Sequence, residues 1–177
     1  HKFKFGGIDK DGIYLDETVN RMAQTHRRMF VQVASQLIKE GKNEKALKAL
    51  DYCQQVIPSK NVAHDYVMSS SKEMADDYIA LGEYAKAEAI LDELANKAVE
   101  YITWYMSLDD ERLAASYENC VRNFYILDEI NKSLERITSL KTGQPEGEMT
   151  VSSEMEEHYA KKFNELYDMF NVRVGRK

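Results

Sequence analysis

Residues that interrupt helices are scarce in this chain. Its 177 residues include only two prolines and eight glycines. Because proline and glycine are the residues that most often end a helix, long stretches can remain helical. Hydrophobic residues make up 44% of the chain and charged residues 31%, a balance that is typical of a folded protein and argues against disorder.

Long apolar runs, paired cysteines and an excess of basic charge are also missing. No apolar run approaches the roughly 18 residues that a membrane span requires. Cys53 and Cys120 have no metal-site or disulfide spacing, so we interpret them as small buried hydrophobic residues. The net charge is −6 and basic residues are mixed with acidic ones, which argues against a nucleic-acid partner. A chain of this length can bury a core without a metal or disulfide, so we expect one domain.

The stretch from Gly82 to Tyr105 has the clearest helical periodicity and predicts a central helix. Its apolar residues recur every three or four positions and so lie on one stripe. Further apolar residues widen the stripe, so we expect the helix to be covered from more than one side. The stripe consists of Ala87, Leu91, Leu94, Ala98, Ile102 and Tyr105, and it is widened by Ile90, Val99, Tyr101 and Trp104.

Capping residues and breakers divide the chain into segments. Asp16 is expected to cap the first helix, which should end near Gly41, and Pro58 should end the second helix. Ser107 is a candidate N-cap, and Ser70 and Ser153 each precede a glutamate by three residues, the pattern of a capping box. The predicted fold is all-α with about six helices: an extended arm (1–15), hairpin 1 (16–58), hairpin 2 (62–106), a long helix (108–140), a linker (141–151) and a terminal capping helix (152–171).

The two hairpins share an internal repeat. Small and apolar residues follow Gly41 and Gly82 at the same spacing, and matched residues also precede each glycine. This pattern resembles the tetratricopeptide repeat, in which small residues allow the helices of a hairpin to approach closely. The glycines are 41 residues apart instead of the usual 34, and only two units are recognisable, so the long and terminal helices are expected to act as a cap. The matched residues are Val33, Ala34, Leu37, Gly41, Ala46, Leu50 and Cys53 against Met74, Ala75, Tyr78, Gly82, Ala87, Leu91 and Leu94.

A second resemblance covers most of the chain. It rests on the strings FKFGGID, YLDET, THRRMF, ALDYCQQVIP, HDYVMSSS and YITWYMSLDDERL. These strings are similar to the C-terminal region of a family of large bacterial multi-pass membrane proteins, whose N-terminal part is a domain of unknown function related to protein O-mannosyltransferases. The resemblance implies that the chain is the water-exposed tail of a membrane-embedded, glycosyltransferase-like protein and faces the periplasm. The family's presumed catalytic acids lie in the membrane part, so no catalytic residue is expected here.

The residues themselves contain no pattern typical of catalysis. The four histidines lack metal-ligand spacing, no serine or cysteine has a partnered base in the sequence, and no glycine-rich phosphate loop is present. Clusters of acidic residues stand at expected helix starts, where caps and solubility account for them. We therefore predict no catalytic residue, no metal and no cofactor.

Two groups of residues are candidates for a partner-binding surface. Arg27 and Arg28 concentrate positive charge on the first helix, where they could pair with Asp109 and Asp110 or bind an acidic or phosphorylated partner. A set of aromatic residues could line a groove that suits a peptide or a sugar ring, or could pack in the core instead. The aromatic set is Tyr66, Tyr78, Tyr101, Trp104 and Tyr105.

These observations lead to three functional hypotheses. The first is a non-catalytic interaction or accessory domain that binds a protein or peptide beside its own membrane domain. The second is a carbohydrate-binding accessory site that contacts the glycan, and the third is a structural tail that forms a homodimer. If the membrane-family resemblance is misleading, a cytoplasmic adaptor is the alternative.

Overall fold

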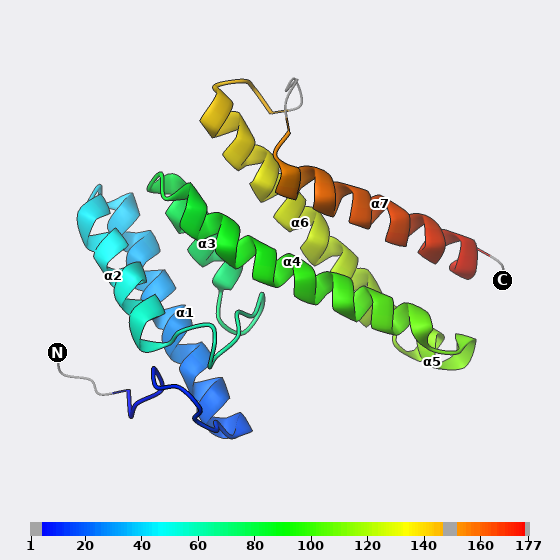
Figure 1. Ribbon diagram of the computed structural model, residues 1–177, viewed down its shortest axis with the longest axis horizontal. Helices are drawn as coiled ribbons and strands as arrows, with labels where there is room; N and C mark the ends of the chain where they lie inside the picture. The colour runs from blue at the N-terminus through cyan, green and yellow to red at the C-terminus, as the bar shows by residue number, and fades with distance from the viewer. Residues whose placement is uncertain (1–4, 147–151, 176–177) are drawn as a thin grey trace. The chain divides into compact units, whose positions relative to one another are not determined.

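The computed structural model describes residues 5–146 and 152–175, and all regular secondary structure within these ranges is α-helical (Figure 1). The predicted all-α fold is therefore confirmed. No helix in this part of the chain is long and apolar enough to cross a membrane. The helices are α1 (Glu17–Lys39), α2 (Asn43–Val56), α3 (Ser71–Ala80), α4 (Tyr84–Ser107), α5 (Asp110–Ala115), α6 (Tyr117–Thr142) and α7 (Glu154–Val174).

The chain divides into two compact units, unit 1 (His1–Ile90) and unit 2 (Leu91–Lys177). Unit 1 contains α1, α2, α3 and the start of α4. Unit 2 contains the rest of α4 together with α5, α6 and α7. The boundary falls inside α4, the helix that the sequence predicts as central, and the prediction of one domain stays a prediction.

In unit 1, α1 and α2 form a helical hairpin, and α3 packs on α1 (Figure 1). Asp16 caps α1 by accepting a hydrogen bond from the Val19 amide at 2.8 Å, as predicted. The core of unit 1 includes several small side chains, which allow helices to approach closely. The buried core residues include Ala34, Ala46, Leu50, Cys53, Met74 and Ala75.

The turns at Gly41 and Gly82 have the same backbone geometry. Their φ angles are 72° and 78°. After Gly41, the Lys42 amide donates to the Leu37 carbonyl at 2.8 Å, and after Gly82 the Glu83 amide donates to the Tyr78 carbonyl at 2.9 Å. Both turns are therefore helix ends that require a left-handed residue. This supports the repeat, whereas its assignment to the tetratricopeptide type stays a prediction.

In unit 2, α7 packs on α6. The Ser153–Glu156 capping box at the start of α7 is present, as predicted. Along α5 and α6 a row of apolar residues is buried, but Tyr117 is 40% exposed. The buried residues are Leu113, Cys120, Phe124, Leu127, Ile130, Leu134 and Ile137. Aromatic rings of the two helices meet between them: Tyr117 and Phe124 of α6 contact Phe163, Tyr167 and Phe170 of α7.

The predicted long helix is wrong in one respect, because it is divided into α5 and α6. Ser116 ends α5 with φ −107° and ψ 8°, and its amide donates to the carbonyls of Arg112 and Leu113. The N-cap of α5 is Asp109 instead of Ser107, which belongs to α4. No proline or glycine marks this break, so helical periodicity alone could not locate it.

The capping box predicted at Ser70 is also wrong. Ser70 has a left-handed backbone with φ 52°, and its side chain makes no cap hydrogen bond. A serine in this conformation does not direct its hydroxyl to the first turn as a cap residue with an extended backbone does.

The arm differs from its predicted conformation, and the linker differs slightly from its predicted bounds. Residues 6–12 form turns and a bend instead of an extended arm, and the ring of Phe5 contacts those of Phe30 and Tyr52. The helix α6 continues to Thr142, so the non-helical connection begins at Gly143. Residues 1–4 of the arm, 147–151 of the linker and the last two residues of the chain lie outside the described residues.

Candidate interaction surface

Arg27 is a structural residue and is not available to a partner. Its side chain is 0% exposed. The guanidinium donates to the main-chain carbonyls of Ile57 at 2.9 Å, Val62 at 2.6 Å and Ala63 at 3.2 Å. These carbonyls belong to the connection between α2 and α3, so Arg27 satisfies loop acceptors that would otherwise be buried without a donor. The prediction that Arg27 lies on a partner-binding surface is therefore wrong.

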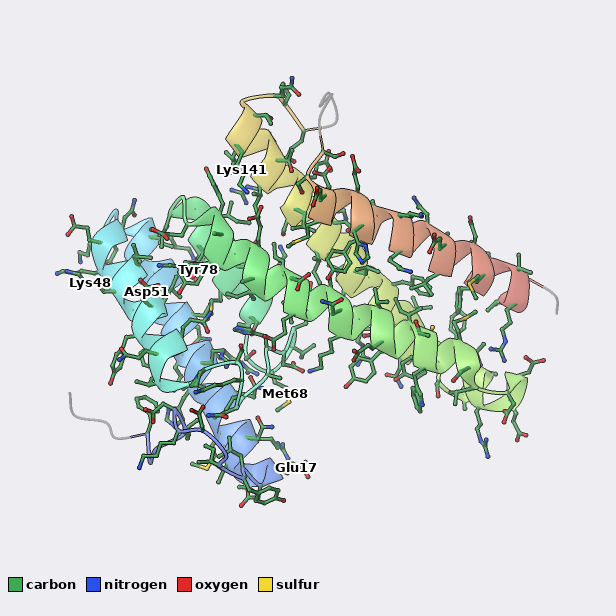
Figure 2. All side chains as sticks on the ribbon, in the orientation of Figure 1. Glu17, Lys48, Asp51, Met68, Tyr78 and Lys141 are labelled. Carbon is green, nitrogen blue, oxygen red and sulfur yellow. The ribbon has the colours of Figure 1, made fainter. Side chains whose placement is uncertain are left out.

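Arg28 lies nearer the surface but has a similar role. It donates to the Met68 carbonyl at 2.6 and 3.0 Å, and Met68 lies in the loop before α3 (Figure 2). The acids that we expected to pair with these arginines have other partners. Asp109 pairs with Arg112 at 3.2 Å, and Asp110 pairs with Arg173 at 3.3 Å.

Tyr78 is also buried, so it is not part of an exposed groove. Its hydroxyl donates to Asp51 at 3.0 Å, which joins α3 to α2, and the two labelled side chains lie side by side in Figure 2. Asp51 also accepts from Lys86 at 2.8 Å. Burial, followed by the negative charge of Asp51, raises the pKa of Tyr78 far above its ordinary value. Tyr66 is half-buried in the loop before α3.

The remaining candidates form an exposed group on α4, which we call the aromatic surface and define as Tyr101, Trp104 and Tyr105. Trp104 is 53% exposed and Tyr101 is 45% exposed, while Tyr105 is half-buried. The rings of Trp104 and Tyr105 meet edge to face, with their centroids 4.8 Å apart. The prediction that Tyr101 and Trp104 widen the buried stripe of α4 is therefore wrong. Tyr66 and Tyr78 belong to unit 1 and are not included in this surface.

A buried polar network in unit 1 was not apparent from the sequence. A hydrogen bond of 2.8 Å joins Nδ1 of His64 to the Ser71 hydroxyl, which lies 2.6 Å from the Ser69 hydroxyl. All three side chains are at most 2% exposed. A histidine beside a serine can activate a nucleophile, but a substrate cannot reach a pair buried in this way. The network instead satisfies polar groups of the α2–α3 connection, since Ser69 donates to the Asp65 carbonyl.

One carboxylate has an unusual proton affinity. Asp77 on α3 accepts from the Ser35 hydroxyl on α1 at 2.7 Å. Partial burial raises the pKa of Asp77 to about 6, and the neighbouring charges of Asp76 and Glu73 act in the same direction. This group joins two helices, and its protonation affects stability.

The described residues offer little for redox or metal chemistry. No group of three or more histidine, cysteine, aspartate or glutamate side chains among them could hold a metal ion. Cys53 and Cys120 are free and buried, as expected for small core residues. Burial raises the pKa of Cys53 to about 12 and that of Cys120 to about 11, so both thiols are unreactive at neutral pH.

Comparison with known proteins adds no relative: no protein-family model, no curated protein and no solved structure matches the chain.

Proposed function

We propose that this chain is a non-catalytic interaction domain and that the aromatic surface of α4 binds a polypeptide. The observation that carries the proposal is the exposure of Trp104, the only tryptophan in the chain, beside Tyr101. Tryptophan and tyrosine contribute large contact areas at low entropic cost and are enriched among the residues that dominate binding energies. A helix that exposes both side by side has the composition of a binding surface.

The parent protein and location are part of the same proposal. They rest on the resemblance to the tails of multi-pass membrane proteins with a mannosyltransferase-related part. In this proposal the domain is tethered beside its own membrane domain in the periplasm, and its partner is a protein or peptide that reaches that compartment. A cytoplasmic adaptor is the alternative.

Selection from a displayed peptide library tests the binding function. The wild-type protein should enrich a peptide family, and Trp104→Ala should weaken binding of the enriched peptides at least 30-fold, as expected for a central aromatic contact. Tyr125→Ala is the matched control, because Tyr125 is 56% exposed on α6 of the same unit and should leave binding unchanged. If no peptide is enriched, or if binding ignores Trp104, the proposal is wrong.

The second candidate is a carbohydrate-binding accessory site. The Trp104 and Tyr105 rings could stack on a sugar as well as on a peptide. Titration with mannose oligosaccharides should then change the tryptophan fluorescence in a saturable way, and a flat response would exclude sugars of this kind. The third, a homodimerisation tail, predicts a concentration-dependent dimer in sedimentation.

A further inference from the structure

At one end of unit 2, Arg173 joins the last turn of α7 to the connection between α4 and α5. Its guanidinium donates to the carbonyls of Met106 and Leu108 and lies 3.3 Å from Asp110. The arginine therefore satisfies carbonyls at the end of α4, where the helix provides no further donors.

Two adjoining hollows open around this arginine, and both are lined by Asp110 and Arg173. One has a volume of about 210 Å³ and the other about 690 Å³. We call them together the Arg173 hollow. The other side chains that line it are mainly apolar: Leu113, Ala114, Tyr117 and Val174 around the smaller hollow, and Met106, Met169 and Val172 with Asp168 around the larger.

Part of the apolar lining is exposed. Met169 is 58% exposed and Val172 55%, and Tyr117 at the edge is 40% exposed. Neighbouring exposed apolar side chains that line a concave surface are typical of a docking site.

The charge of this region indicates the chemistry of the partner. Asp110 and Asp168 line the hollow, and Asp110 lies next in sequence to Asp109 and Glu111. The positive charge of Arg173 is directed to main-chain carbonyls and to Asp110. Among the described residues of unit 2, sixteen are acidic and nine are basic. A cationic partner is therefore attracted to this unit, and an anionic one is repelled.

A hollow on α1 in unit 1 provides the contrast. It is lined by Met29, Gln32, Val33, Gln36 and Leu37, none of which is charged. Met29 is 56% exposed, almost the same as Met169. The two hollows thus offer similar apolar contacts and differ in charge.

We propose that the Arg173 hollow binds a cationic amphipathic polypeptide segment, with apolar side chains against Met169 and Val172 and lysines or arginines beside Asp168. This inference rests on the proposed function as an interaction domain. It adds a second surface and the chemistry of its partner.

The test is fluorescence anisotropy with a labelled synthetic helix that carries leucines on one face and lysines on the other. The whole chain should bind this peptide, and added salt should weaken binding. A version with glutamates in place of lysines and a version with serines in place of leucines should bind at least tenfold more weakly. Equal binding of the glutamate version would overturn the charge assignment, and equal binding of the serine version would overturn the apolar one.

Variants locate the binding. Met169→Ser should weaken binding about tenfold and Asp168→Asn about threefold. The matched control Met29→Ser should have no effect, and neither should Trp104→Ala. If only Trp104→Ala weakens binding, the Arg173 hollow is not the site while the proposed function stands. If the wild type binds none of the peptides, or forms a dimer that Met169→Ser abolishes, the inference is wrong even if library peptides still bind through Trp104.

Discussion

The α2–α3 connection of unit 1 and the α6–α7 pair of unit 2 are held in place by different chemistry. In unit 1 the connection from α2 to α3 is long, and polar side chains such as Arg27, Arg28 and His64 provide its hydrogen bonds. In unit 2 the rings of Phe124 and Phe170 meet between α6 and α7. The difference shows that a long connection packed against a helix, as between α2 and α3, needs donors for its carbonyls, whereas helices that pack along their length, such as α6 and α7, can rely on apolar contact.

The strongest test of this comparison is removal of the Arg27 guanidinium. Arg27→Met keeps an apolar stem but leaves the carbonyls of Ile57, Val62 and Ala63 without their donor. We expect a loss of about 3 kcal/mol in the free energy of unfolding, measured by urea denaturation. Arg28→Met, which removes more exposed hydrogen bonds, should cost about 1 kcal/mol. Equal losses would show that burial of the arginine is not the cause.

Each unit also contains a buried tyrosine that donates to an aspartate, which allows a matched test. Tyr159 donates to Asp92 at 2.6 Å in unit 2, and Tyr78 donates to Asp51 at 3.0 Å in unit 1. When the Tyr78 hydroxyl is removed, Asp51 still accepts a hydrogen bond from the ammonium of Lys86. We therefore expect Tyr159→Phe to cost about 2 kcal/mol and Tyr78→Phe about 1 kcal/mol in thermal or urea unfolding. The reverse order would contradict the role given to Lys86.

The repeat glycines sharpen the comparison inside unit 1. Gly41 and Gly82 have open space where a Cβ atom would be added, so only their positive φ angles oppose alanine. Gly41→Ala and Gly82→Ala should each cost about 1 kcal/mol, and asparagine, which tolerates this conformation better, should cost less at both positions. A much larger loss at one glycine would show that the two turns are not equivalent.

The smallest expected effect is a gain in stability at Asp77. Because partial burial raises the pKa of Asp77 to about 6 from 3.8, its protonated form is favoured in the folded state. The stability that this protonated carboxyl contributes is fully present below pH 3.8 and is lost as the pH rises through about 6. Asp77→Asn should therefore stabilise the protein at pH 7.5 by roughly 1 kcal/mol or less, after solvent screening is considered.

The pH dependence is the control for this last prediction. The stability difference between Asp77→Asn and the wild type should shrink as the pH falls from 7.5 to 4.5, because the wild-type carboxyl becomes neutral. A difference that does not change with pH would show that the substitution acts through packing or through the bond to Ser35, not through the charge.

The order of helices, and where several of them begin and end, followed from local sequence. Asp16, Gly41, Pro58, Gly82 and Ser153 act on their own backbone neighbourhood, so their effects can be predicted without knowledge of distant contacts. The fold class and the repeated glycine turns were predictable for this reason. The break at Ser116 could not be predicted in this way, because no proline or glycine marks it.

The role of Arg27 shows what the tertiary structure decided. Arg27 lies four residues after Ala23 and four before Val31, both buried, so its place on the apolar stripe of α1 was a signal that it could be buried. That signal did not reveal its partners, which are carbonyls 30 and 35 residues away. The same holds for Trp104, whose helical position was predictable from the sequence. Its exposure depends on which side of α4 the neighbouring helices leave uncovered, because periodicity defines a stripe but not how much of its edge is buried.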